Sequence, residues 1–222
     1  MNNISSNINE HAWSFNSDGK RWEDYDTIVC PDGEIIDMQK LLDDQNRAKA
    51  ALLHLQPFFS AFVGKLRPIY TFKIQTQATD GVNLFINPQF TAKLNLSEKC
   101  FVLAHEIMHC VLNHLRRGRG HDPKRSNIAA DYECNITLSD ASGCMGLFKQ
   151  STIKGMDAYI DNKYNNWGYE KIYDDVSNSS NDSQDNSQQA QQAQKNQEQL
   201  SQDYIDGWNK AMEDYKNGKL KI

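Results

Sequence analysis

The chain has 222 residues and a formal net charge of −5 at neutral pH. This length suits one domain with a hydrophobic core, and the acidic balance argues against a protein that binds nucleic acid over its whole surface. Five cysteines without a Cys-x-x-Cys pair argue against a disulfide framework, and the sequence shows neither a signal peptide nor an apolar run near 18 residues. We therefore expect a reduced, cytoplasmic protein that does not enter a membrane.

The N-terminal part of the sequence predicts an arm followed by two helices. Residues 1–35 are polar and rich in turn formers, so we expect a loosely packed N-terminal arm. Apolar residues at helical spacing predict a helix over 36–55. Pro57 fits the first turn of a second helix, because proline is well tolerated at that position.

Two β-prone runs follow these helices. Residues 69–74 and 82–86 are rich in β-branched and aromatic side chains, and the turn signal Thr79-Asp80-Gly81 lies between them. We expect the two runs to pair as antiparallel strands. The second run could then be the edge along which an extended peptide lies and forms backbone hydrogen bonds.

The central helix carries the most informative motif of the sequence. Its N-cap is Asn95, with Glu98 three residues later as in a capping box, or Ser97, and its apolar run continues to Leu112. Within that run, residues 105–109 read His-Glu-Ile-Met-His.

The pentad predicts a zinc hydrolase. Positions i and i+4 share one face of a helix, so His105 and His109 can bind a single Zn²⁺ ion. Glu106 lies one step round the helix, where its carboxylate can act as general base on a water molecule held by the metal. Two satisfied core histidines are the alternative, but a nearly all-round apolar helix buries three such groups only at high cost.

A second helix is expected from about Ser126 to Leu138, and its polar side bears on the metal. Asn127, Asp131 and Asn135 recur every four residues and so project from one stripe. If this helix packs antiparallel to the pentad helix, Asp131 can supply the third zinc ligand. Asn127 and Asn135 would then orient the ligands by hydrogen bonds.

Other residues compete for the position of third ligand. On a continuous helix His114 would lie about 140° round from His109 and would face away from the metal. Glu133 points about 200° from Asp131, so only one of the two carboxylates can face the site. A cysteine, Cys110 or Cys134, is a further alternative, although cysteines more often serve as small buried apolar residues.

The C-terminal part of the sequence changes in composition. Residues 36–176 would form the folded domain, and residues 177–199 are almost entirely Ser, Asn, Gln and Asp, which predicts a disordered tether. Apolar residues then recur on one helical face over 200–222. We expect this amphipathic helix to pack on the domain or on a partner.

The chain resembles a family of metallopeptidase domains that, in many bacterial and phage proteins, precede a von Willebrand A-like domain. The matching residues span roughly 38–221 without the tether, and they are Thr79-Asp80-Gly81, Asn87-Pro88, Leu103 to His109, His114, Arg117, Asn127 to Tyr132, Asn135, Tyr169 to Tyr173, Trp208 and Gly218 to Leu220. The resemblance implies a zincin-like α+β fold, mostly helical with a small antiparallel sheet beside the pentad helix. It carries over His105, Glu106 and His109 directly, and Asp131 by its place in the second motif.

The leading hypothesis is a zinc metallopeptidase that acts on a protein or peptide substrate, with His114 or Tyr132 as candidates for stabilising transition-state charge. The alternative is a non-catalytic, zinc-stabilised binding module for a protein partner. Nucleic acid is a less favoured partner, and it would bind a basic loop that contains Arg116, Arg117, Arg119, Lys124 and Arg125.

Overall fold

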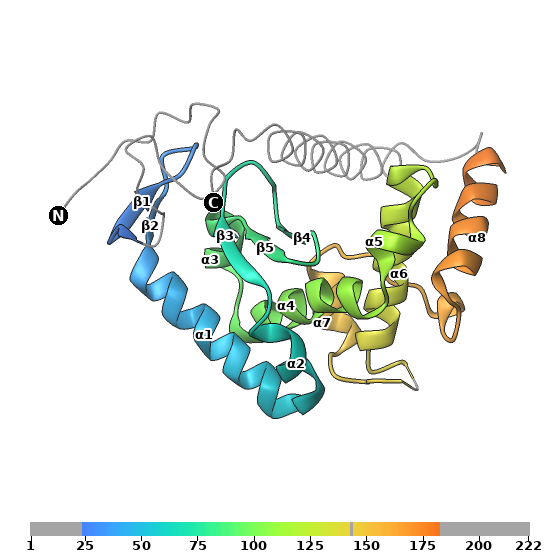
Figure 1. The fold of residues 1–222 in the computed structure, drawn as a ribbon, viewed down its shortest axis with the longest axis horizontal. Helices are drawn as coiled ribbons and strands as arrows, with labels where there is room; N and C mark the ends of the chain where they lie inside the picture. The colour runs from blue at the N-terminus through green and yellow to red at the C-terminus, as the bar shows by residue number, and fades with distance from the viewer. Residues whose placement is uncertain (1–23, 143, 183–222) are drawn as a thin grey trace. The chain divides into compact units, whose positions relative to one another are not determined.

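The computed structural model describes residues 24–142 and 144–182 (Figure 1). The architecture is α+β and mostly helical, as the sequence predicts. The described residues form two compact units, 24–103 and 104–182, which we take in turn. The expected arm up to residue 23, the tether from residue 183 and the C-terminal helix lie outside the described residues.

The first unit begins with a hairpin and a long helix. Strands β1 (Thr27–Val29) and β2 (Ile35–Asp37) pair antiparallel. Helix α1 (Met38–Leu55) confirms the helix expected over 36–55, and the Asp37 carboxylate caps it by accepting a hydrogen bond from Lys40 N. Pro57 opens a short 3₁₀ turn, η2 (Pro57–Phe59), which continues into α2 (Ser60–Val63).

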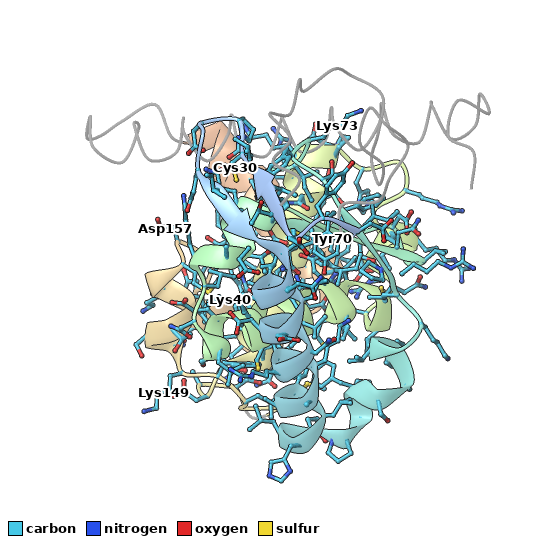
Figure 2. The ribbon with its side chains drawn as sticks, turned by 90° about the vertical axis from the view of Figure 1, so that its left-hand side faces the viewer. Cys30, Lys40, Tyr70, Lys73, Lys149 and Asp157 are labelled. Carbon is cyan, nitrogen blue, oxygen red and sulfur yellow. The ribbon has the colours of Figure 1, made fainter. Side chains whose placement is uncertain are left out.

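A three-stranded sheet completes the strands of this unit. Its order is β3 (Arg67–Tyr70), β5 (Asn83–Ile86) and β4 (Gln77–Thr79), with β3 parallel and β4 antiparallel to β5. The hydroxyl of Tyr70, labelled in Figure 2, donates to Gln45 Oε1 at 2.6 Å and so ties β3 to α1.

The expected antiparallel pairing of 69–74 with 82–86 is wrong. The turn at Asp80 and Gly81 joins β5 to β4, because the Asp80 carboxylate accepts hydrogen bonds from Val82 N and Asn83 N. The sheet is therefore mixed. Because β5 is its central strand, with neighbours on both sides, the expectation that this run forms an edge for a peptide is also wrong.

Helices α3 (Pro88–Lys93) and α4 (Leu96–Val111) follow the sheet. Asn95 and Glu98 form the reciprocal capping box at the start of α4: Asn95 N donates to Glu98 Oε2 at 2.8 Å, and Glu98 N donates to Asn95 Oδ1 at 3.0 Å. Asn95 rather than Ser97 is therefore the N-cap. Helix α4 continues into the second unit, where it presents the pentad.

The second unit is helical. It contains α5 (His114–Arg117), α6 (Pro123–Leu138), α7 (Gln150–Gly155), the 3₁₀ turn η3 (Asn162–Tyr164) and α8 (Tyr169–Asp182). Figure 1 shows α6 and α8 side by side, packed through a buried cluster that consists of Ala129, Ala130, Tyr164, Tyr169 and Ile172.

Two boundaries in this unit differ from the expected ones. Helix α6 begins three residues before Ser126, because the Asp122 carboxylate caps it through Arg125 N and Pro123 fills its first position. Helix α8 runs to Asp182 and so extends into the range expected for the tether. Among the described residues, no helix combines the length and the apolarity that crossing a bilayer requires.

The capping box yields a stability prediction. Replacing Asn95 by alanine should lower the free energy of unfolding by about 1 kcal/mol, because one end of α4 loses its cap. Ser97→Ala is the matched control, since Ser97 is exposed and lies inside the helix, and its cost should stay within about 0.5 kcal/mol. Urea unfolding measures both values, and a larger loss for Ser97→Ala would contradict the assignment.

Candidate metal centre

Helices α4 and α6 bring three donor atoms together within the second unit. Nε2 of His105 and Nε2 of His109 lie 2.9 Å apart. Each of these nitrogens lies 3.3 Å from Oδ1 of Asp131. The i, i+4 spacing on α4 and one residue of the polar stripe on α6 thus meet as the sequence predicts.

This triangle has the size that a tetrahedral zinc site requires. Bonds of about 2.0–2.1 Å to nitrogen and oxygen place two ligands of a tetrahedral ion about 3.3 Å apart. The separations of 2.9, 3.3 and 3.3 Å lie close to that edge length. Two imidazoles and one carboxylate are also a donor set that Zn²⁺ favours. The residues therefore fit a divalent cation.

The two asparagines of the stripe hold two of these donors, His105 and Asp131, in place. Asn135, only 1% exposed, accepts a hydrogen bond at Oδ1 from His105 Nδ1 at 2.7 Å and donates from Nδ2 to the Tyr159 carbonyl at 2.8 Å. Because an amide oxygen only accepts, His105 carries a proton on Nδ1, and its other ring nitrogen, Nε2, faces Asp131. Asn127 Nδ2 donates to Asp131 Oδ2 at 3.2 Å, which leaves Oδ1 to face the histidines.

The charges within the triangle are those of a cation site. Burial alone would raise the pKa of Asp131, but hydrogen bonds from His105 and His109 outweigh it, and the pKa falls below its ordinary value. Burial opposes a charged His105, yet the Asp131 carboxylate raises its pKa, whereas burial lowers the pKa of His109. Without a metal, the protonated His105 ring balances Asp131, and a dication would displace that proton.

Glu106 lies beside this triangle and is buried, with 5% of its surface exposed. Burial, with some contribution from the Asp131 charge and against the effect of His105, raises the pKa of Glu106 to about 7. Among residues 24–142 and 144–182, no hydrogen-bond donor or salt-bridge partner meets its carboxylate. A buried carboxylate without a partner is costly, so its neighbour is expected to be water or a ligand.

His114 does not lie where a continuous helix would place it, and the expectation of continuity is wrong. Helix α4 ends at Val111. Asn113, the N-cap of α5, adopts the left-handed conformation (φ 58°, ψ 35°), so the chain changes direction before α5 begins at His114. His114 Nδ1 consequently lies 3.0 Å from Nδ1 of His109. It meets the ring nitrogen opposite the one that faces Asp131, so His114 supports the triangle and does not join it.

Glu133 and Cys134 are the other competitors for the third ligand. Glu133 Oε2 accepts from His114 Nε2 at 2.6 Å, which agrees with the expectation that Glu133 and Asp131 face different ways. Cys134 offers its Sγ within 4.8 Å of ring nitrogens of both pentad histidines. The shorter distances favour Asp131 as the donor, and burial raises the pKa of the Cys134 thiol well above its ordinary value.

The remaining sequence candidates have structural contacts. Tyr132 packs its ring against Tyr159 and Tyr164, with centroids 5.2 and 4.5 Å apart, which is a packing role. In the basic segment, Arg117 pairs with both Glu133 and Glu170. The carboxylate of Glu170 and the carbonyl of Tyr159 were missed by sequence reasoning, because only the packing of distant segments brings them to the site.

Proton displacement predicts how zinc affinity depends on pH. Since the raised pKa of His105 keeps a proton at the site, zinc must compete with that proton below this pKa, and the apparent affinity should rise with pH. The gain should approach about tenfold per pH unit for one displaced proton. Calorimetric titrations in buffers of different ionisation heat should count about one proton released per zinc ion, and binding without release would contradict this charge distribution.

The chain matches no curated protein and no solved structure. A family model described as "Putative metallopeptidase domain" matches residues 41–221. The matched range is most of the 222 residues and contains both helices that carry the three donors. The chain therefore belongs to this metallopeptidase-domain family.

Proposed function

We propose that the chain is a zinc-dependent peptidase with a zincin-like fold, in which His105, His109 and Asp131 hold the ion and Glu106 is the general base. The observation that carries the proposal is the triangle of donors 2.9–3.3 Å apart, beside which lies the buried carboxylate of Glu106. Among the described residues, this carboxylate has no hydrogen-bond or salt-bridge partner. Membership of the family supports a protein or peptide as the substrate.

When bound, the ion would act as a Lewis acid that polarises the scissile carbonyl and lowers the pKa of a water molecule towards 7. Glu106 then accepts a proton from the attacking water and returns it to the leaving amine. A pKa near 7 suits both steps, because the same carboxyl must first be a base and then an acid. Asn127 and Asn135 keep Asp131 and His105 oriented during the cycle.

A non-catalytic module stabilised by zinc is the second candidate, and the position of Cys134 favours it. If the thiol became a fourth protein ligand, the site would be closed to water, as structural zinc sites are. The buried Glu106 carboxylate, which has no partner among the described residues, favours the peptidase, because a structural zinc site does not require a general base. A nucleic-acid partner is less supported, because two glutamates already neutralise Arg117 in the basic segment.

Substitution of the base separates these two functions. Glu106→Gln should retain about one zinc per chain, since Glu106 is not a proposed ligand, while hydrolysis of an unfolded protein should fall by about 10²–10⁴-fold. Glu98→Gln is the matched control on the same helix, because glutamine also completes a capping box, and its activity should be unchanged. Elemental analysis and a peptide-release assay measure the two properties. Full hydrolysis by Glu106→Gln would end the peptidase proposal.

The pH profile of hydrolysis should report the same carboxyl. Glu106 can accept a proton only when ionised, so kcat/KM should rise with pH through its pKa and then level off. The pKa of about 7 refers to the metal-free site, and a nearby dication favours the ionised form, so the acid limb should lie at or below this value. A rate that falls throughout this rise in pH would contradict the role of Glu106.

A further inference from the structure

The basic segment, residues 116–125, joins α5 to α6 and concentrates positive charge in an acidic chain. Its ten residues carry five cationic side chains and one carboxylate, Asp122, whereas the whole chain has a net charge of −5. Neither the proposed ligand set nor the proposed chemistry uses these cations. Like charges gathered on one stretch raise the local potential and attract a partner of opposite charge.

The arginines of this segment differ in how the fold treats them. Arg117 is neutralised, because its guanidinium pairs with two glutamates at 3.0 and 2.7 Å. Arg116 and Arg119 are exposed, and Arg125 is partly exposed. Within the described part of the chain, no carboxylate forms an ion pair with any of these three. Their charges are available to a partner.

The fold brings the three arginines close together. Arg119 N donates to the Arg116 carbonyl at 3.2 Å, so a single turn separates these two residues. The end of α5 lies against the first turn of α6, since a Cβ on Gly118 would lie only 2.5 Å from Ser126 Oγ (Figure 1). Arg119 follows this glycine and Arg125 precedes this serine. We call Arg116, Arg119 and Arg125 the basic patch.

Aromatic contacts with α8 hold the segment in place. The His121 ring stacks on Tyr173 with centroids 4.2 Å apart, and its Nδ1 lies 2.8 Å from the Tyr169 hydroxyl. Asp122 N donates to the Tyr173 hydroxyl at 3.1 Å. A charged group on a fixed loop loses less conformational entropy on binding than one on a mobile loop. The segment thus presents its charges from a defined position.

The patch lies close to the candidate metal centre within the second unit. On α6, Arg125 precedes Asp131 by six residues, which corresponds to about 9 Å along the helix axis. Lys124 precedes Asp131 by seven residues and so lies within about 20° of the same helix face. An extended peptide advances about 3.3 Å per residue. A peptide held at the metal could therefore reach the patch with a side chain about three to five residues from the cleaved bond.

We propose that the basic patch binds acidic side chains of the substrate, so that the peptidase prefers polypeptides with aspartate or glutamate about three to five residues from the cleaved bond. The inference rests on the proposed function, because a peptidase site in the same unit makes a polypeptide the expected ligand. Each exposed ion pair contributes modestly, so three together should favour an acidic peptide over a neutral one by about tenfold at low salt.

Nucleic acid is the other polyanion that arginines bind, and it fits the patch less well. A duplex carries one charge about every 1.7 Å along its axis, and strong binding to it draws on about 6–10 phosphate contacts. The patch offers three arginines in a chain whose net charge is −5, so the remaining surface would repel a long polyanion. A short acidic stretch of polypeptide matches the size of the patch.

Binding of labelled peptides to the full-length Glu106→Gln chain, with zinc present, tests the proposal without cleavage. Two unstructured peptides differ only in carrying a run of glutamates or of glutamines. In fluorescence anisotropy the acidic peptide should bind about tenfold more tightly at low salt, and added salt should shrink the difference. Equal affinities would overturn the proposal. A single-stranded oligonucleotide of the same net charge that binds more tightly and displaces the acidic peptide would also overturn it.

Charge-matched variants locate the effect. Glutamine at all three positions of the basic patch should abolish the preference for the acidic peptide, whereas lysine at these positions should keep it. The control replaces three exposed cations of the first unit by glutamine, namely Arg47, Lys65 and Arg67. This control changes the net charge equally and should keep the preference. Its loss in both glutamine variants would show an effect of net charge alone and would contradict the assignment.

Hydrolysis by the active chain separates this inference from the proposed function. The acidic substrate should show about tenfold higher kcat/KM, and glutamine variants of the basic patch should lose this advantage through KM with little change in kcat, because the patch lies away from the reacting atoms. If neither peptide were hydrolysed, the proposed function would fail. The affinities of the uncut peptides would still decide whether the patch binds acidic side chains.

Discussion

The second unit depends on a cluster of charged and polar side chains buried between two helices. Asp131 lies 3.3 Å from ring nitrogens of His105 and His109. Glu106, which follows His105 in the pentad, is also buried. Burying a carboxylate costs several kcal/mol unless a counter-charge and hydrogen bonds compensate for it. Pairing between Asp131 and the two histidines offsets part of this cost, and a bound dication would offset the rest. The arrangement of α4 and α6 is therefore best understood as a site kept for a cation.

The surrounding contacts are organised by that constraint. Asn127 and Asn135 occupy the remaining atoms of Asp131 and His105 on one side. His114 occupies the remaining nitrogen of His109 on the other side. Glu106 alone lacks such a partner among the described residues. This difference agrees with the proposed roles, in which His105, His109 and Asp131 are held in place and Glu106 exchanges protons.

Local patterns were sufficient to predict α1, α4 and α6 and the proximity of His105, His109 and Asp131. The spacing of His105 and His109, the four-residue repeat through Asp131 and the capping box at Asn95 each depend on short-range geometry, and the structure places all of them as expected. The expected continuity of the helix through His114 was wrong because Asn113 adopts a left-handed conformation. Asparagine tolerates this conformation but does not demand it, so the break in the helix has no clear sequence signal.

Long-range pairing accounts for the other differences. Strand β5 pairs with β3 in parallel, although the intervening turn suggested an antiparallel hairpin between these runs. Glu133 meets His114 and Arg117, and Arg117 in turn reaches Glu170, which is 53 residues away. No periodicity links such positions. The contacts arise only once α6 and α8 have packed.

The most direct test of the account is an anomalous-scattering map, recorded at the zinc edge, from crystals of the zinc-loaded chain. The account predicts one peak within about 2.0–2.2 Å of His105 Nε2, His109 Nε2 and an Asp131 carboxylate oxygen, with no fourth protein ligand. A peak bonded to Cys134 Sγ at about 2.3 Å in place of Asp131, or a peak away from both histidines, would contradict it.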